Sequence, residues 1–305
     1  MSLDSDQFIE TELWEPLIRS IQLRQCVPFL GAAVARDCLP DGGGLARQLA
    51  AEFGYPFDDP SNLQSVSQFG ATTRRDPSFP KGFIQELIGQ AQQAYAGAGR
   101  GVAPRIYELL ADLDAPMYIT TNYDSLLERV FRARSIEPMI ETCRWNDELV
   151  RDLGPYRRYD STARRPVVFH LHGELDRASS MVVTEDDYVN FIVQLALEQK
   201  TTRKTMMWPP VVQALSSKKL LFIGYSLKDL NFRVLMRYLF SHYKTTHSGL
   251  HVSIQLQPEL DGMTADQQAT AQRYFQHYFQ DSKVRLHWSD GTAFLEELTM
   301  RLRQP

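Results

Sequence analysis

Four segments of the sequence place polar or very small residues directly after a run of apolar residues. The first has only small side chains, and the second carries an amide and a carboxylate. The third carries two histidines, and the fourth a hydroxyl beside a glycine. They are residues 31–33, 120–124, 170–174 and 224–231. Open α/β sheets bind ligands at the carboxyl ends of their strands, so we expect the functional site among these segments.

The third segment contains His170 and His172, separated by one leucine. Alternation along a strand puts both histidines on the same face. An unperturbed imidazole has a pKa near working pH and can serve as a general base. His172 stands immediately before Gly173, where the backbone opens at the end of the strand, and we predict that it is this base. We predict that His170 is a core histidine, hydrogen-bonded to its surroundings.

The small-residue turn Gly31-Ala32-Ala33 lies between a predicted strand and the segment that follows it. Such a turn lets the backbone approach a phosphate, with helix N–H groups facing it. The same residues also make an ordinary tight connection, and both interpretations stay open. Gly224 and Ser226 offer a second close turn, with a hydroxyl. This turn is no nucleophile elbow, because Lys228 stands where that motif has its second glycine.

Asn122 and Asp124 follow the second predicted strand. Polar residues at such a position are first of all helix caps, and Thr121 or Asn122 could cap a helix that begins near Tyr123. One cap accounts for one polar residue. It does not account for Asn122 and Asp124 together, at the same end of the sheet as the glycine turn. We therefore include both in the candidate site.

Strand-like apolar runs alternate with helix-like stretches along the chain, and most runs are nearly continuous in apolar residues, as in parallel strands covered on both faces. The pattern predicts an α/β fold with a Rossmann-like, doubly wound parallel sheet of about six strands. We predict one domain over residues 1–305, with a helical insertion at about 45–113. The predicted strands are 27–31, 116–121, 167–171, 219–224, 251–256 and 284–287, and the predicted helices are 45–53, 83–95, 103–113, 123–133, 187–197, 211–216, 230–241 and 292–302.

The composition narrows the class of protein. Hydrophobic residues make up 43% and charged residues 23% of the 305 residues, which is an ordinary globular balance. The net charge of −4 does not point to nucleic acid or a membrane as a partner. Cys26, Cys38 and Cys143 form no C-x-x-C pair, which suits a reducing cytosol. The short apolar runs and the acidic start of the chain predict neither a membrane span nor a signal peptide.

The four segments, in this order, resemble the sirtuin family, and especially its bacterial antiphage-defence branch that hydrolyses NAD. The resemblance runs through nearly the whole chain. Its glycine-alanine-glycine turn matches residues 31–33, with Ala33 in place of the second glycine and Ala35 in place of the usual serine. Its threonine-x-asparagine-x-aspartate matches residues 120–124, its histidine-glycine matches residues 172–173, and the glycine-x-serine of the branch, with a following aspartate and asparagine, matches residues 224–231.

The resemblance implies an NAD site with a role for each matched position. Gly31, Ala32 and Ala33 would lie against the pyrophosphate, and Gly224 and Ser226 would line the adenosine half. Asp124 would contact the nicotinamide carboxamide. The catalytic residues would be Asn122, holding the nicotinamide ribose or a water, and His172, acting as base on a ribose hydroxyl or water.

The chemical requirements of NAD cleavage agree with these roles. Cleaving the nicotinamide–ribose bond needs mainly orientation, a polar hold on the leaving group and an activated water. Ordinary sirtuins, which are protein deacylases, carry a zinc module with paired C-x-x-C ligands. The three cysteines here cannot build it, so we expect no metal and favour NAD hydrolysis. A deacylase and a non-catalytic nucleotide-binding subunit of a defence complex are the alternatives.

Free hydrolysis of NAD would harm the cell that makes the enzyme, so we expect restrained activity in a cytoplasmic homo-oligomer. By resemblance, a separately encoded ATPase or nucleic-acid-guided protein can be the partner. We expect no membrane association and no direct binding of nucleic acid.

Overall fold

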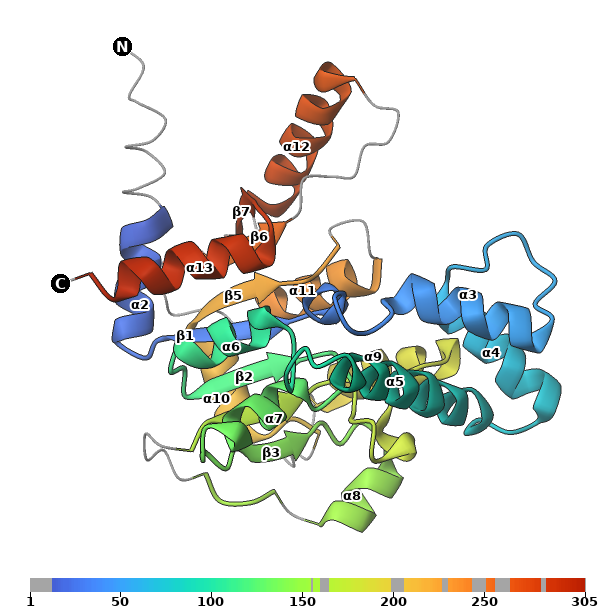
Figure 1. Ribbon diagram of the computed structural model, residues 1–305. Coiled ribbons are helices and arrows are strands. Elements are labelled where there is room, and N and C mark those ends of the chain that lie inside the picture. The colour runs from blue at the N-terminus through green and yellow to red at the C-terminus, as the bar shows by residue number, and fades with distance from the viewer. Residues whose placement is uncertain are drawn as a thin grey trace. The chain divides into compact units, whose positions relative to one another are not determined.

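The computed structural model describes residues 13–154, 156–159, 165–198, 206–226, 230–242, 251–255, 264–280 and 284–304 (Figure 1). By its internal contacts the chain divides into two compact units. The first unit is Met1–Val34, Arg105–Tyr118 and Val212–Pro305, and the second is Ala35–Pro104 and Ile119–Val211.

The strands form one seven-stranded parallel sheet in the order β3-β4-β2-β1-β5-β6-β7. This confirms the predicted Rossmann-like α/β fold, with one strand more than expected. Six strands lie within two residues of their predicted bounds, although Leu256, at the end of one prediction, is outside the described residues. The strands are β1 Cys26–Leu30, β2 Met117–Thr120, β3 Met139–Thr142, β4 Val167–His170, β5 Lys219–Ile223, β6 His251–Gln255 and β7 Val284–Trp288.

The additional strand is β3, whose four residues include the charged Glu141. This short run lacks the continuous apolar pattern of the other strands. Glu141 is nevertheless buried, because Arg144 and Arg157 both approach its carboxylate, at 3.4 Å and 2.7 Å. A buried strand can contain a charged residue that is paired in this way, but the local sequence pattern does not show the pairing.

The predicted helices are all present, some with shifted ends, and α2, α4, α8 and α12 are additional. Helix α4 is rich in serine, threonine and glutamine, so its sequence shows little helical periodicity. Residues 45–113 form helices and no strand, whereas the single domain with an insertion stays a prediction. The helices are α2 Glu15–Gln22, α3 Gly42–Phe53, α4 Leu63–Arg74, α5 Phe79–Gly97, α6 Arg105–Asp112, α7 Leu126–Ala133, α8 Asp147–Leu153, α9 Glu185–Glu198, α10 Pro209–Ser217, α11 Leu230–His242, α12 Ala265–Gln280 and α13 Gly291–Leu302, with 3₁₀ turns η2 Ala32–Ala35 and η3 Ala178–Ser180.

Aromatic packing holds the first unit together. Phe29 of β1 and Phe222 of β5 are register partners, and their ring centroids are 5.2 Å apart. Trp14 stacks on Phe294 of α13 at 4.9 Å, where α13 packs on α2 and α6 (Figure 1). This packing fixes the carboxyl ends of β1 and β5 relative to each other.

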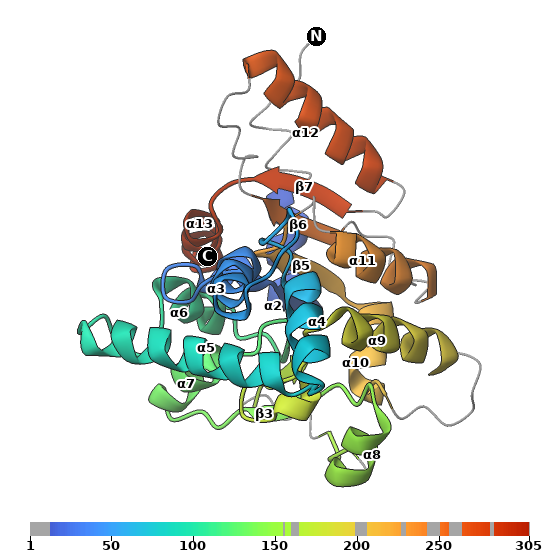
Figure 2. The same cartoon turned by 90° about the vertical axis from the view of Figure 1, so that its right-hand side faces the viewer.

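The second unit contains the helical part of the chain. Helix α4 packs on α3 and α5, and it also packs on α9 (Figure 2). Strands β3 and β4 run side by side in this unit, with Thr142 opposite His170. Helix α5 also packs on the η3 turn, in the segment that follows β4 and contains His172.

Candidate active site

The sequence-predicted site residues fall into two sets, one in each unit. Gly31, Ala32, Ala33, Gly224 and Ser226 belong to the first unit, and Asn122, Asp124 and His172 belong to the second. In the first unit, main-chain hydrogen bonds join the turns after β1 and β5, and in the second they join the loop after β2 to the segment after β4.

In the first unit, the turns after β1 and β5 interlock through their backbones. The Gly31 N–H donates to the carbonyl of Ile223 at 2.8 Å, and the Ala33 N–H donates to the carbonyl of Gly224 at 3.0 Å. A Cβ on Gly31 would lie 2.6 Å from the Gly224 oxygen and 2.8 Å from the Tyr225 ring. Gly224 has a φ of +82°, and a Cβ there would strike Val34. Both glycines are therefore required by packing.

These bonds correct one expectation about the phosphate turn. Helix N–H groups were expected to face a phosphate here, but two amides of this turn already donate to protein carbonyls. Residues 32–35 also form only a single 3₁₀ turn. Ala32 and Ser226 are exposed at these two turns.

In the second unit, the loop after β2 is bonded at almost every residue. The Asn122 N–H donates to the Thr120 hydroxyl at 3.0 Å, and the Leu175 N–H donates to the Tyr123 carbonyl at 2.8 Å. The Tyr123 hydroxyl donates to the Val182 carbonyl at 2.7 Å. Asn122 is thus held in a fixed main-chain conformation next to the segment that follows β4.

The predicted helix cap is wrong. Helix α7 begins at Leu126, not near Tyr123, so neither Thr121 nor Asn122 caps it. The N-cap position is Ser125, which makes no capping bond with its side chain, and Oδ1 of the preceding Asp124 accepts a hydrogen bond from the Leu126 N–H at 3.1 Å. A buried carboxylate at a helix start is stabilised by the positive end of the helix dipole. Asp124 therefore has a structural role in addition to its predicted contact with a ligand.

The two histidines have opposite surroundings, although only one residue separates them. His170 is buried, and its Nε2 lies 2.7 Å from Oε1 of Glu128 on α7. Burial disfavours the charged ring, but the hydrogen bond and charge of Glu128 outweigh burial and raise the pKa of His170 to about 9. His170 is the hydrogen-bonded core histidine that the sequence predicted, and it carries a positive charge.

His172 lies among aromatic rings, and its Nε2 is buried with no hydrogen-bond partner. The ring makes edge contacts with Phe191 at 5.0 Å and Tyr188 at 6.4 Å, both on α9. Burial lowers the pKa of His172 to about 4, so the expectation of an ordinary pKa is wrong. His172 is therefore neutral at working pH. An unpaired buried nitrogen is costly unless a ligand satisfies it.

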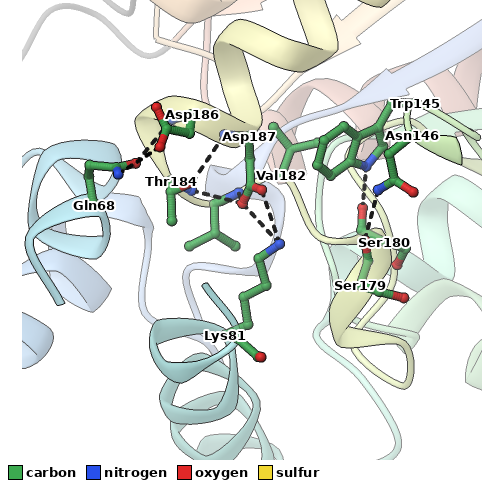
Figure 3. Close-up of polar contacts among 12 residues, drawn as sticks. Gln68, Lys81, Trp145, Asn146, Ser179, Ser180, Val182, Thr184, Asp186 and Asp187 are labelled. Atoms are coloured by element: carbon green, nitrogen blue, oxygen red, sulfur yellow. Dashed lines mark hydrogen bonds and ion pairs between the residues drawn. The ribbon is translucent and has the colours of Figure 1, made fainter. Parts of the chain in front are cut away.

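The segment that supports His172 is fastened by contacts that the sequence did not reveal (Figure 3). The His172 carbonyl accepts from the Val182 N–H at 2.9 Å, and Trp145 Nε1 donates to the Ser180 carbonyl at 2.7 Å. Asp187 Oδ2 accepts from the Val183 and Thr184 amides, each at 3.1 Å. The segment 173–184 is thereby tied to the start of α9.

Lys81 of α5 completes this support through a buried ion pair with Asp187 of α9, at 3.0 Å (Figure 3). The side chains of Lys81 and Asp187 are 6% and 12% exposed, so solvent screens the pair little. Two further bonds between Gln68 and Asp186 join α4 to α9. The helices between 63 and 97 therefore brace the helix whose Phe191 and Tyr188 contact His172.

Replacing Lys81 with methionine is expected to destabilise the fold by about 3 kcal/mol, at the lower end for a broken buried pair, because Asp187 keeps its two amide donors. The measurement is urea unfolding followed by tryptophan fluorescence. A cycle with Asp187→Asn and the double variant isolates the coupling energy. Additive losses from the two single changes would contradict an energetic role for the pair.

No group of three or more histidine, cysteine or acidic side chains in the described part of the chain is placed to hold a metal ion. No helix of the same part is long and apolar enough to cross a membrane.

Comparison with known proteins gives a family and several relatives. The SIR2-like domain family matches residues 116–283, more than half of the 305 residues. The NAD(+) hydrolase ThsA of Acinetobacter baumannii (strain 532279) is 24% identical over 274 residues, which are 85% of this chain and 49% of that protein. The NAD(+) hydrolase ThsA of Bacillus cereus (strain MSX-D12) is 28% identical over 204 residues, 66% of this chain and 36% of that protein.

The matched chain therefore spans about half, or less, of the length of these relatives. The matched region 116–283 contains the loop of Asn122 and Asp124, both histidines and the turn of Gly224 and Ser226. The ordered motifs, the parallel sheet and the family match agree with one another, and the protein belongs to the SIR2-like domain family.

Proposed function

We propose that this protein is an NAD hydrolase. In this reaction water replaces nicotinamide on the ribose, so the carbon–nitrogen bond breaks and nicotinamide, ADP-ribose and one proton are released. Support comes from membership of the SIR2-like family and from relatives that are named NAD(+) hydrolases at 24% and 28% identity. We extend that activity to this chain as a proposal, because it aligns with only part of each relative.

The observation that carries the proposal is that Asn122 and His172 follow neighbouring strands, and that Nε2 of His172 is buried without a hydrogen-bond partner. Asn122 follows β2, and His172 follows β4, the neighbouring strand in the sheet. The amide of Asn122 can orient a ribose hydroxyl or a water. The neutral ring of His172 has an unsatisfied nitrogen that can accept a hydrogen bond from the same kind of group.

Cleavage of the nicotinamide–ribose bond does not require a strong catalytic base. Nicotinamide carries a positive charge in NAD and leaves as a neutral molecule, so the barrier depends on orientation and on stabilising an oxocarbenium-like ribose. We assign Asn122 and His172 as the catalytic residues and Asp124 as a contact of the nicotinamide carboxamide. The remaining NAD contacts that we propose are Gly31, Ala32, Ala33, Gly224 and Ser226.

The pH dependence of the reaction is expected to reflect the low pKa of His172. The neutral ring is the active form, and with a pKa of about 4 it stays neutral down to about pH 5. Titration of His172 is therefore expected to leave kcat/KM for NAD constant from about pH 5 to about pH 8. Protonation of His172 lowers kcat/KM only below that range. A midpoint near the ordinary histidine pKa of about 6.5 would contradict this environment for His172. Fluorescence at each pH checks that the fold is intact.

The experiment that tests the function is incubation of the purified chain with NAD, with and without an acylated peptide, and quantification of products. Equal amounts of nicotinamide and ADP-ribose without peptide support the proposal. Nicotinamide release only with acylated peptide would identify a deacylase. Binding of NAD without turnover would identify a nucleotide-binding subunit, and either of these outcomes overturns NAD hydrolysis.

We further propose that the activity serves antiphage defence in the cytoplasm and is restrained until a trigger acts. An enzyme that consumed NAD freely would deplete its own cell. A homo-oligomer with low basal turnover, activated by a trigger or by a separately encoded partner, meets this requirement. Light scattering alongside NAD consumption tests it, and a monomer with full turnover alone would contradict it.

A further inference from the structure

The side chain of His170 bridges a carboxylate and the main chain of Asn122. Its Nε2 lies 2.7 Å from Glu128 Oε1, and its Nδ1 lies 3.1 Å from the carbonyl oxygen of Asn122. His170 and Glu128 are 2% and 1% exposed, so neither group reaches water. This bridge joins α7, β4 and the loop after β2.

The partners decide where the protons are. A carbonyl oxygen can only accept a hydrogen bond, so Nδ1 must carry a hydrogen toward Asn122. Nε2 shares a proton with the carboxyl group of Glu128 across the 2.7 Å contact. The raised pKa of His170 favours the imidazolium form of the ring in this pair. Glu174 adds a further negative charge near the ring, in the same direction as Glu128.

The position of this bond matters because it holds the main chain of Asn122. The Asn122 N–H donates to the Thr120 hydroxyl, and the Asn122 carbonyl accepts from His170. Losing the carbonyl bond would remove a restraint on the orientation of the peptide after Asn122. A shift of about 1 Å in a catalytic group can cost about 10²-fold in rate.

We propose that the buried Glu128–His170 pair positions Asn122 for catalysis, through the Nδ1–H···O=C hydrogen bond that His170 donates to the Asn122 carbonyl. This inference rests on the proposed function, because it gives Asn122 its catalytic role. Glu128 fixes the orientation and charge of the ring, and neither Glu128 nor His170 contacts the substrate. Both are positioning residues.

The first test compares two replacements of His170 in a Glu128→Gln background, which removes the buried charge. Asparagine places its amide nitrogen near the position of Nδ1 and keeps the donor to Asn122. Glutamine places its amide nitrogen near the position of Nε2 and loses that donor. Neutralising both partners avoids leaving an unpaired buried charge. The exposed His277→Asn serves as the matched control.

We expect Glu128→Gln and Glu128→Gln/His170→Asn to keep kcat for NAD within about tenfold of the parent, because the bond to Asn122 persists. We expect Glu128→Gln/His170→Gln to lose about 10²-fold in kcat with little change in KM. A kcat that is the same in the asparagine and glutamine variants would overturn the positioning role. An equal rise in KM in both of these variants would also overturn it.

A second test does not depend on enzymatic activity. Nitrogen-15 NMR of histidine-labelled protein at pH 7 reports the protonation of each ring nitrogen, and the signal of His170 is assigned by its loss in His170→Asn. A proton on Nδ1 supports the proposal. A bare Nδ1 overturns it. If the wild-type chain fails to cleave NAD but Nδ1 of His170 is protonated, the proposed function fails while the bridge stands.

Discussion

Asn122→Ala and His172→Ala are each expected to reduce NAD cleavage by about 10²–10⁴-fold, the usual range for removing a group that assists proton transfer or orientation. The alanine at 122 removes the amide but keeps the main-chain bonds to Thr120 and His170, so the loop keeps its conformation. The alanine at 172 removes an unpartnered buried nitrogen. The rate is measured as nicotinamide release under saturating NAD.

Matched controls separate chemistry from folding. Asn190→Ala on the exposed side of α9 and His277→Ala on α12 change the same residue types at exposed positions. Both are expected to retain wild-type turnover, and all four variants are expected to unfold within a few degrees of the wild type. Near wild-type nicotinamide release by His172→Ala would remove it from the catalytic assignment.

Gly173→Ala is expected to destabilise the protein by about 2–5 kcal/mol, and to abolish NAD cleavage in whatever fraction remains folded. Gly173 has a φ of +91°, which costs a side-chain-bearing residue about 1–2 kcal/mol. An added Cβ would also overlap the carbonyl group of Ser180 and lie 2.7 Å from the Met181 nitrogen. The atoms of Ser180 and Met181 that the Cβ would meet belong to the main chain, so the clash is relieved only if the segment moves. That movement is expected to cost about 1–3 kcal/mol more.

The movement would displace His172, because its own carbonyl is bonded to Val182 in the same segment. Gly89→Ala is the control, since Gly89 lies inside α5 and a Cβ there would meet nothing within 4 Å. That change is expected to stabilise the helix by about 0.5–1 kcal/mol and leave turnover unchanged. Chemical denaturation and NAD turnover measure both variants. A Gly173→Ala protein as stable as the wild type would contradict the close packing of this turn.

The two histidines show that the partners of a desolvated ring decide which of its forms is favoured. Each begins with the same intrinsic pKa. His170 has a carboxylate and a carbonyl as acceptors, so its charged form is favoured. His172 has aromatic neighbours and no acceptor at Nε2, so its neutral form is favoured. One is suited to hold the main chain, and the other to accept a proton or a hydrogen bond.

The sequence by itself determined the parallel α/β class, the approximate bounds of six strands and the placement of Asn122, Asp124 and His172 just after strands. These features are local, because continuous apolar runs and the residues that end them are read within a few positions. The same locality explains the failures. Strand β3 is short and contains Glu141, and the hydrogen bond from the first amide of α7 to Asp124 depends on where the loop after β2 ends.

The tertiary structure alone decided the charge states and the supports of the site. Glu128 meets His170 across 42 residues of sequence, and Lys81 meets Asp187 across 106. The conflict that makes Gly173 necessary arises from Ser180, and the low pKa of His172 arises from its burial. Desolvation and pairing depend on what the folded chain brings within a few ångströms, and no local pattern of residue types contains that information.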